Sequence, residues 1–280
     1  MQDTIHLHDK VKELLYSLTG ITLNENKDIM ISNRLQKLKR DTSFDGNLDD
    51  LLVAIENGKF VTEFINSFTT NKTHFFREEF HFVDLRDRIL PEFARNGKEI
   101  KMYCSASSTG EEPYSMAMTV AEVSETLGIR IKASILATDI DTNVLQYAAD
   151  GVYRYAKSSK EFPDWIKPQK YFKKRVQKNL ATEEILIKVK DELKKYLTFG
   201  VMNLSDINYP FERNEFDVIF CRNVLIYFND VDQNKILKKL FKHLKIGGTL
   251  YLGHSESPQD LINYVTRAGQ NIFIKNKDID

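Results

Sequence analysis

The sequence predicts an α/β fold in which a doubly wound, mostly parallel sheet follows a helical N-terminal domain. From about residue 98 onward, short apolar segments alternate with segments of helical periodicity, as in the β-α-β units of a parallel sheet. Before that point, apolar residues recur every three or four positions, which is typical of amphipathic helices. A length of 280 residues suits one large domain or two smaller ones.

The helical part is predicted to form a domain of its own, over residues 1–78. In its second segment, Ile31, Leu35 and Leu38 fall on one helix face. The helices expected in this part of the chain, including one that leads into the sheet, cover residues 11–18, 26–40, 48–56, 60–68 and 78–93.

Residues 79–280 are predicted to form the sheet domain. Its expected strands are 100–105, 133–138, 216–221, 249–253 and 271–275, and the last of them alternates like an edge strand. The helices expected between them are 113–127, 143–149 and 232–244. Gly247 and Gly248 are expected to end the last of these helices.

Residues 157–195 interrupt this alternation and are predicted to form an inserted subdomain. They contain 12 Lys and Arg against 6 Asp and Glu, a net charge of +6. The stretch 185–189 alternates apolar and basic residues, like an exposed antiparallel strand. We expect a small basic β subdomain that returns to the main sheet at about residues 196–199.

Composition and charge exclude several protein classes. The 40 basic and 40 acidic residues cancel, which argues against a polycation that binds nucleic acid or membrane surfaces. Cys104 and Cys221 lie in apolar runs and suit buried free thiols in a reducing compartment. No apolar run approaches the ~18 residues that span a bilayer, and no signal peptide is visible. We therefore expect a cytoplasmic protein without membrane insertion.

The loop after the first predicted strand is a candidate cofactor site. Residues 105–110 are small, so the backbone can approach a ligand closely, and Pro113 suits the first turn of a helix. The loop is neither a dinucleotide fingerprint nor a phosphate-binding loop. Glu111 and Glu112 would repel a pyrophosphate but suit a cationic ligand with hydroxyls, such as S-adenosylmethionine (SAM). An ordinary turn with capping acids remains the alternative.

Two further strand ends carry polar residues. Asp139 follows the second predicted strand, where an acid can accept both ribose hydroxyls of a nucleoside cofactor. A helix N-cap is the alternative function there, and it suits Asp141 or Thr142 better. Arg222 and Asn223 end the buried strand 216–221 abruptly, which suggests the lip of a site or, alternatively, a helix cap.

Four segments resemble the bacterial chemotaxis receptor methyltransferases, the CheR family. They are NKTHFFR at 71–77, STGEEPYS at 108–115, ATDID at 137–141 and CRNVLIYF at 221–228. Their order and spacing match as well, and the resemblance spans about residues 11–275. It implies a class I SAM-dependent methyltransferase domain of the Rossmann-like type, a helical N-terminal domain and an inserted antiparallel β subdomain.

The resemblance implies SAM as the cofactor and S-adenosylhomocysteine as its product. Glu112 would hold the methionine ammonium, and Asp139 would hold the ribose. Two residues, Asn203 and Leu204, would flank the adenine. The full cofactor set implied by the resemblance is Asn71, Thr73, Arg77, Glu112, Asp139, Asn203, Leu204, Arg222 and Asn223.

The implied reaction is methyl transfer to a glutamate side chain of a chemoreceptor, which gives a methyl ester. The resemblance implies that Arg77 and Tyr227 lie near the methyl group. A glutamate is ionised at pH 7, so the transfer needs no general base, and we see no His/Cys cluster with metal-ligand spacing. Arg77 is the natural orienter of the acceptor because a guanidinium offers a planar fork to a carboxylate. The alternative for Arg77 is a salt bridge at a helix start, and the alternative for Tyr227 is an aromatic residue of the core.

The acceptor would be the glutamate-rich helical domain of a chemoreceptor. Arg34, Lys37 and Arg40 form a basic row on the predicted helix 26–40, and the family docks its substrate on this helix. A solvated charged face is the alternative interpretation. Some members also bind a receptor pentapeptide on the β subdomain through a glycine-rich turn, but the stretch 178–184 has no Gly. We therefore expect no pentapeptide tether, and we expect a monomer.

Two other functions remain open from the sequence. One is SAM-dependent methylation of another protein or of a small molecule, on the same fold. The other is a signalling module that binds SAM without transferring its methyl group. Methylation of nucleic acid is the least favoured, because the charge is balanced and no motif for a flipped base is present.

Overall fold

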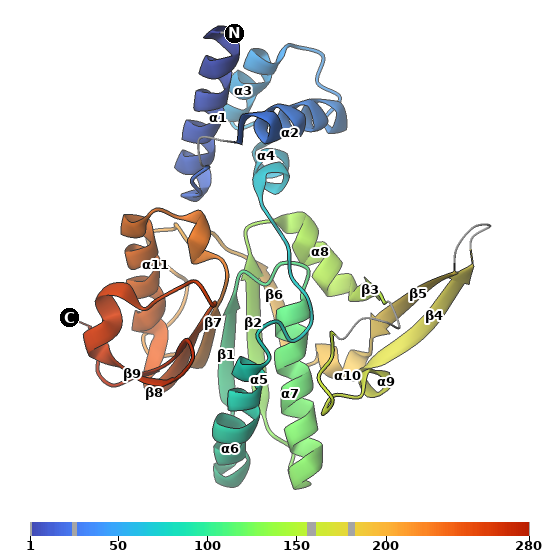
Figure 1. The fold of residues 1–280 in the computed structure, drawn as a ribbon, viewed down its shortest axis with the longest axis vertical. Helices are drawn as coiled ribbons and strands as arrows, with labels where there is room; N and C mark the ends of the chain where they lie inside the picture. Colours follow the sequence, from blue (N-terminus) through green and yellow to red (C-terminus); the bar gives the residue numbers. More distant parts are fainter. Residues whose placement is uncertain (1, 24–26, 156–160, 179–182, 280) are drawn as a thin grey trace.

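The computed structural model describes residues 2–23, 27–155, 161–178 and 183–279. The N-terminal helices pack around a core of their own, to which all four contribute Leu, Ile, Val or Phe side chains. An N-terminal capping box between Asn47 and Asp50 fixes the start of the third helix. These helices lie beyond the carboxyl ends of the parallel strands (Figure 1). They are α1 (Gln2–Thr19), α2 (Asp28–Asp41), α3 (Leu48–Glu56) and α4 (Val61–Phe68).

The helix expected at 78–93 is three consecutive segments instead of one. They are α5 (Phe80–Asp84), the π-helical turn η2 (Leu85–Ile89) and α6 (Leu90–Asn96). Pro91 has no N–H with which to continue the α-helical ladder, so the helix widens just before it. Gly97 then ends α6 in the left-handed conformation, with φ of 66°.

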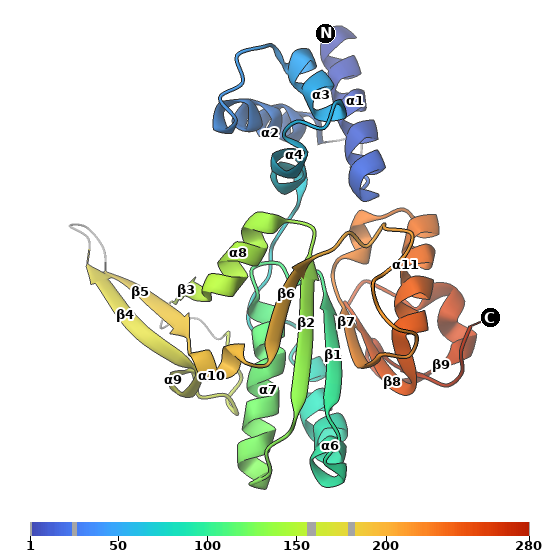
Figure 2. The ribbon, with the colours of Figure 1, turned by 180° about the vertical axis from the view of Figure 1, so that it is seen from behind.

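The main sheet has seven strands in the order β6-β2-β1-β7-β8-β10-β9. The first five pair in parallel, and β10 pairs antiparallel with both β8 and β9. Figure 2 shows β6, β2 and β1 side by side. The strands are β1 (Ile100–Ser105), β2 (Ala133–Asp139), β6 (Leu197–Val201), β7 (Phe216–Cys221), β8 (Leu244–Leu252), β9 (Val265–Gly269) and β10 (Ile272–Lys275).

Two expectations about the end of the sheet were wrong. The strand expected at 271–275 is not at the edge, because β9 covers it and forms the edge itself. The glycines expected to end the last helix lie within β8, since α11 already ends at His243. Gly247, with φ of 80°, bends the chain inside that strand.

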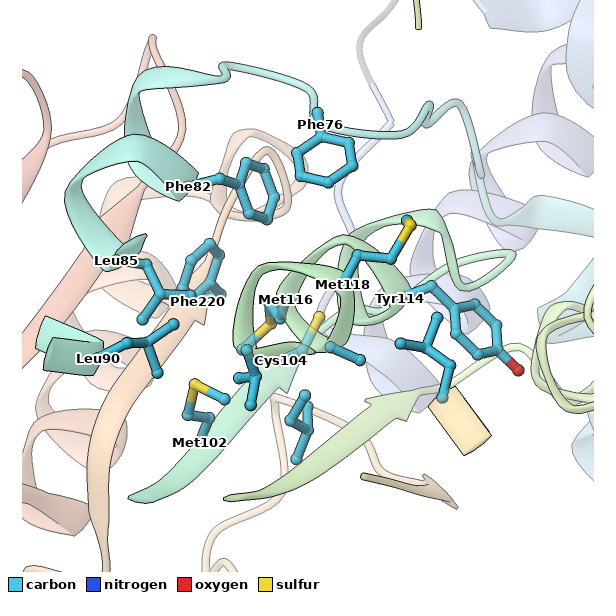
Figure 3. Packing of buried hydrophobic residues seen from close by; sticks show 14 of the residues in the cluster. Phe76, Phe82, Leu85, Leu90, Met102, Cys104, Tyr114, Met116, Met118 and Phe220 are labelled. Carbon is cyan, nitrogen blue, oxygen red and sulfur yellow. The ribbon is translucent and has the colours of Figure 1, made fainter. Parts of the chain in front are cut away.

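Helices cover both faces of the sheet, as the doubly wound prediction requires. Along β1, the side chains of Met102 and Cys104 join the core beneath α5, η2, α6 and α7 (Glu111–Leu127), whereas Tyr103 joins the core beneath α11 (Asp230–His243). Figure 3 shows the first of these cores, in which Phe82 and Phe220 pack together. The α/β fold class is confirmed.

A three-stranded antiparallel sheet, with the order β3-β5-β4, projects from the main sheet (Figure 1). The stretch expected at 185–189 as an exposed strand lies in the central strand, and its Ile187 and Val189 are buried against the main core. Among the described residues, no helix is long and apolar enough to cross a membrane. The elements here are β3 (Val152–Arg154), α9 (Pro168–Tyr171), β4 (Phe172–Lys178), β5 (Glu183–Val189) and α10 (Asp191–Lys194).

Candidate functional site

A cavity of about 480 Å³ lies between the N-terminal helices and the carboxyl ends of the parallel strands. Because β1, β2, β6 and β7 are parallel neighbours, the residues that follow them meet at one sheet edge, where open α/β sheets bind ligands. All nine residues of the expected cofactor set line this cavity, and so does Tyr227. Residues from the sequence-distant segments 19–23, 27–34 and 68–77 complete its wall.

The loop between β1 and α7 brings backbone up to the cavity. The N–H groups of Ala106 and Ser107 both donate to the carbonyl of Thr138, at 2.9 and 2.8 Å, which binds the loop to the end of β2. Gly110 has φ of 96°, and a Cβ there would lie 2.8 Å from the Cβ of Ala148. Glycine at position 110 is therefore required for the close approach of this loop to Ala148.

Asp139 ends β2 and is only 8% exposed. Its two oxygens accept the N–H of Ser108 at 2.8 Å and of Asp141 at 3.0 Å. Burial raises the pKa of this carboxyl, and the two N–H donors oppose that rise. Each oxygen has a further lone pair, so the carboxylate can also accept ligand hydroxyls. The N-cap function belongs to Asp141, which accepts the first N–H groups of α8 (Thr142–Asp150).

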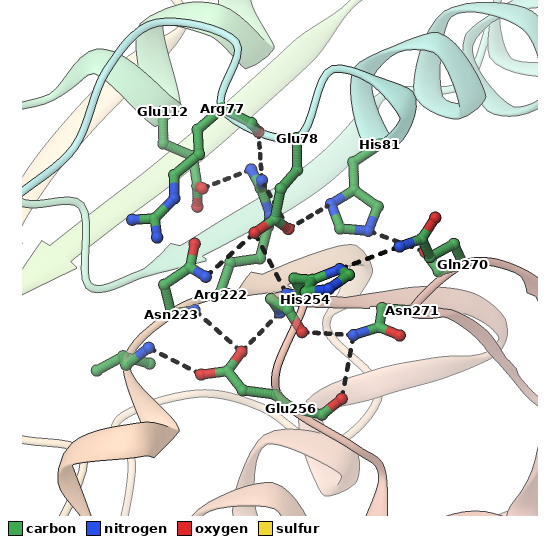
Figure 4. A network of polar contacts seen from close by, with 12 residues as sticks. Arg77, Glu78, His81, Glu112, Arg222, Asn223, His254, Glu256, Gln270 and Asn271 are labelled. Carbon is green, nitrogen blue, oxygen red and sulfur yellow. Dashed lines mark hydrogen bonds and ion pairs between the residues drawn. The ribbon is translucent and has the colours of Figure 1, made fainter.

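A buried ion triad lies at the other side of the cavity (Figure 4). The guanidinium of Arg222 contacts Glu112 at 2.7 Å and Glu78 at 3.2 Å, and its side chain is fully buried. It also donates to the backbone carbonyl of Arg77. Burial raises the pKa of Glu112 and would raise that of Glu78, but Arg222 opposes both effects and leaves the pKa of Glu78 lowered.

The triad gives Glu112 a protein partner that the sequence did not predict. Its second oxygen accepts a hydrogen bond from the thiol of Cys104, at 3.3 Å. Both Cys104 and Cys221 are buried free thiols, as expected. The Glu112 carboxylate is thus held in one orientation at the cavity wall, which pre-organises it for a cationic group.

The segment before α5 ties the N-terminal helices to the sheet edge. The amide of Asn71 donates to Asp141 at 2.7 Å and to the hydroxyl of Thr69 at 3.2 Å. Arg77 is half-buried, and its Nη1 donates to the carbonyl of Lys72 at 3.2 Å. In this structure, the Asn71 side chain therefore holds the cavity wall together as well as lining it.

Asn203, expected beside the adenine, lines the cavity and makes two hydrogen bonds within the protein. Its Nδ2 donates to the carbonyl of Leu18, at 2.9 Å, and its Oδ1 accepts the N–H of Ser205 at 2.9 Å. The Nδ2 group thus joins α1 to the sheet domain, and the Oδ1 group holds the turn that follows Asn203. Leu204 beside it is buried and offers an apolar wall to the cavity.

The expected basic row of α2 is divided in the structure. Lys37 and Arg40 are exposed. Arg34 instead turns toward the cavity, where its Nη1 donates to the carbonyl of Thr69 at 3.1 Å and its guanidinium lies 5.9 Å from the centre of the Phe68 ring. The three residues are therefore not one solvated face.

Several site residues were missed by sequence reasoning. Glu78 and Glu256 hold the loop after β7, and Lys27 and Lys72 are exposed at the cavity. Glu78 directly follows a motif that was recognised, which is a usable signal. No sequence signal was available for Glu256, because the residues of the loop that it holds lie some 30 residues earlier in the chain. Among the described residues, no cluster of His, Cys, Asp or Glu could hold a metal ion.

Comparison with known proteins gives a consistent result. The model of the CheR methyltransferase SAM-binding domain matches residues 71–273. The chemotaxis protein methyltransferase of Escherichia coli is 38% identical over 272 residues, which cover 96% of this chain and 90% of that protein. The corresponding protein of Borreliella burgdorferi is 35% identical, over 88% of this chain and 86% of its own length. Chemotaxis protein methyltransferase 2 of Pseudomonas aeruginosa is 32% identical, over 94% of this chain and 91% of its own length.

Proposed function

The chain belongs to the CheR methyltransferase family, and we propose that it methylates glutamate side chains of chemoreceptors during sensory adaptation. It is a SAM-dependent methyltransferase of the chemotaxis system, as its family and relatives indicate. The identity of the acceptor, a glutamate on a receptor helix, is the part that we propose.

The observation that carries the proposal is the separation of charge along the cavity wall. The acidic lining residues, Glu112 and Asp139, are both at the sheet edge, and both are largely buried. Lys27 and Lys72 are exposed, on the side formed by the N-terminal segments. The two interior carboxylates, of which Glu112 is paired with Arg222, fit a cationic cofactor, and the exposed lysines fit an acidic acceptor at the mouth.

The buried carboxylates fit the functional groups of SAM. We assign the methionine ammonium to Glu112, which the triad fixes in place, and the ribose hydroxyls to Asp139, whose oxygens have free lone pairs. Leu204 and Met202 offer apolar surface for the adenine ring. When bound, SAM supplies an activated methyl group, so the protein is needed chiefly for binding and alignment.

Arg77 and Tyr227 orient the acceptor in this proposal. Both line the cavity and are only partly buried, so an acceptor can reach them. The fork of Arg77 guides the incoming carboxylate, and the hydroxyl of Tyr227 positions its reacting oxygen. The glutamate is already ionised at neutral pH, so neither residue has to remove a proton. Arg77 should guide without pairing too tightly, since stabilising the ground state slows the transfer.

Receptor docking is assigned to Lys37 and Arg40 on the exposed face of α2, with Arg34 acting nearer the cavity. We further propose that the protein acts as a monomer. We also propose that it acts in the cytoplasm, since its free buried thiols suit a reducing compartment. No pentapeptide tether is proposed, because the stretch 178–184 has no Gly. Part of that stretch, 179–182, lies outside the described residues. Calorimetric titration with a receptor pentapeptide tests the last point, and clear binding would contradict it.

The proposal is tested by incubating the protein with receptor-bearing membranes and methyl-labelled SAM. Base-labile label on the receptor is expected, because methyl esters hydrolyse in base. A labelled small product, or SAM binding without transfer, would contradict the proposal and support one of the alternatives.

The variant Arg77→Ala should retain the fold and most of the SAM affinity. Its turnover is expected to fall on the order of 10²-fold, the size of effect that follows when a reacting group loses its alignment by about 1 Å. Arg130→Ala is a matched control, since Arg130 is exposed and does not line the cavity. Near-normal receptor methylation by the Arg77 variant would remove Arg77 from the mechanism.

A further inference from the structure

The loop from Arg222 to Tyr227 has little regular structure. It carries Arg222 and Asn223, which are expected to bind the cofactor, and Tyr227, which is expected near the methyl group. Asn223 is in the left-handed conformation, with φ of 56°, and only residues 225–227 form a single 3₁₀ turn, η3 (Leu225–Tyr227). Asn adopts this conformation more readily than other non-glycine residues, but the conformation still costs free energy that contacts of the loop must offset. Some other group must therefore fix the shape of this loop.

That group is the carboxylate of Glu256, which follows β8 and is 8% exposed. One of its oxygens accepts the N–H groups of Val224 and Leu225, at 2.9 and 2.8 Å. The other accepts those of Asn223 and Gly253, at 2.9 and 2.6 Å. Four backbone donors converge on one side chain, as Figure 4 shows in part.

The contacts of Glu256 continue to the reacting residues. The N–H of Tyr227 donates to the carbonyl of Val224 at 3.2 Å, so the anchored residue in turn places the tyrosine. On the other side, the anchored Asn223 directly follows Arg222 and donates through its amide to Glu78, at 3.2 Å. Displacement of the loop would therefore move both the ion triad and the tyrosine.

Gly253 brings the loop and the end of β8 into direct contact. A Cβ on this glycine would lie 2.6 Å from the backbone nitrogen of Asn223 and 2.8 Å from an oxygen of Glu256. The carboxylate lies between the two segments and accepts N–H groups from both of them. The internal carboxylate is thus the acceptor on which the four N–H groups depend.

We propose that Glu256 is a positioning residue for methyl transfer, acting through the backbone of residues 223–225 to place Arg222 and Tyr227. The inference rests on the proposed function of this site. If Glu256 only stabilised the fold, a variant that remains fully folded would keep its turnover. A positioning function predicts that the turnover of such a folded variant falls.

The test is the nearly isosteric variant Glu256→Gln. An amide presents one oxygen and one NH₂ group, so two of the four backbone donors lose their acceptor and face another donor. We expect kcat to fall on the order of 10²-fold, as for a displacement of about 1 Å in a catalytic group. The KM for the receptor should stay within about threefold of the wild-type value, because docking on α2 is untouched.

Two further variants keep the test decisive. Glu256→Asp retains the charge on a shorter side chain, and its kcat should lie between those of the wild type and the Gln variant. If the Gln variant does not fold, a kcat of the Asp variant below that of the wild type still supports the positioning function. Asp217→Asn is the matched control, because Asp217 accepts the N–H of Lys101 at 2.9 Å at the opposite end of the strand that leads into the loop. This control is expected to lose stability without losing kcat.

Folding is monitored by thermal unfolding, and all rates are measured well below the midpoint. A wild-type kcat in folded Glu256→Gln or Glu256→Asp would overturn the positioning function. Equal losses of kcat in the Asp217 control would overturn it too, since they would mark a general effect of lost stability. Failure of the wild type to methylate the receptor would instead overturn the proposed function.

Discussion

Replacing Arg222 by Met removes the cation of the buried triad and leaves two carboxylates facing each other. Arg222 is fully buried, and it is 2.7 Å from Glu112 and 3.2 Å from Glu78. Breaking a buried ion pair by removing one partner destabilises a protein by roughly 3–5 kcal/mol, because a buried charge is left uncompensated. We expect a loss of this size in the free energy of unfolding at pH 8, measured by urea denaturation.

The pH dependence of this loss tests its cause. Without the guanidinium, burial and mutual repulsion will raise the pKa values of Glu78 and Glu112 in the folded variant above those in the unfolded chain. The folded variant then binds more protons than the unfolded chain, so its stability rises as the pH falls. The difference in the free energy of unfolding between the wild type and the variant should therefore be smaller at pH 5.5 than at pH 8.

A matched control is Lys238→Met, which removes an exposed partner of Asp260 at 2.7 Å. Exposed pairs contribute about 0–1 kcal/mol, so this variant should be close to the wild type at both pH values. Two results would refute an electrostatic cause. One is a loss of less than about 1 kcal/mol in the free energy of unfolding of the Arg222 variant, and the other is a difference from the wild type that does not change with pH.

Two further predictions concern receptor docking and acid sensitivity. Lys37→Glu combined with Arg40→Glu should weaken receptor methylation and reduce its salt dependence, since exposed charges act within a Debye length of about 8–10 Å; unchanged rates across a salt series would exclude docking there. His81 is buried, and burial lowers its pKa to about 3. The unfolded chain therefore binds an extra proton at pH 5, which makes the wild type roughly 2 kcal/mol less stable than at pH 7. His81→Gln should show a correspondingly smaller loss in urea denaturation at the two pH values, and an equal loss would contradict this account of His81.

Elements with strong local signals were predictable from the sequence. The strands 100–105 and 216–221 are short apolar runs that are buried from both faces, and their predicted bounds are those of β1 and β7. The convergence of site residues was predictable for a topological reason, since parallel strands end at one edge. The helices expected at 48–56 and 113–127 likewise have ends close to those of α3 and α7.

Features that depend on contacts distant in the sequence were not predictable. The edge strand β9 is polar and exposed, so its sequence resembles a loop. The inward turn of Arg34 depends on the carbonyl of Thr69, which only the packing of α2 against α4 brings near. The anchoring of the loop 222–227 by Glu256 needs β7 and β8 to lie side by side, and nothing local to either segment indicates it.

The most direct test of the central claim is a crystal structure of the protein with S-adenosylhomocysteine. The account predicts the product in the cavity at the sheet edge, with its amine on Glu112 and its ribose hydroxyls on Asp139. Binding at any other place, or a product with both carboxylates turned away from it, would contradict the account.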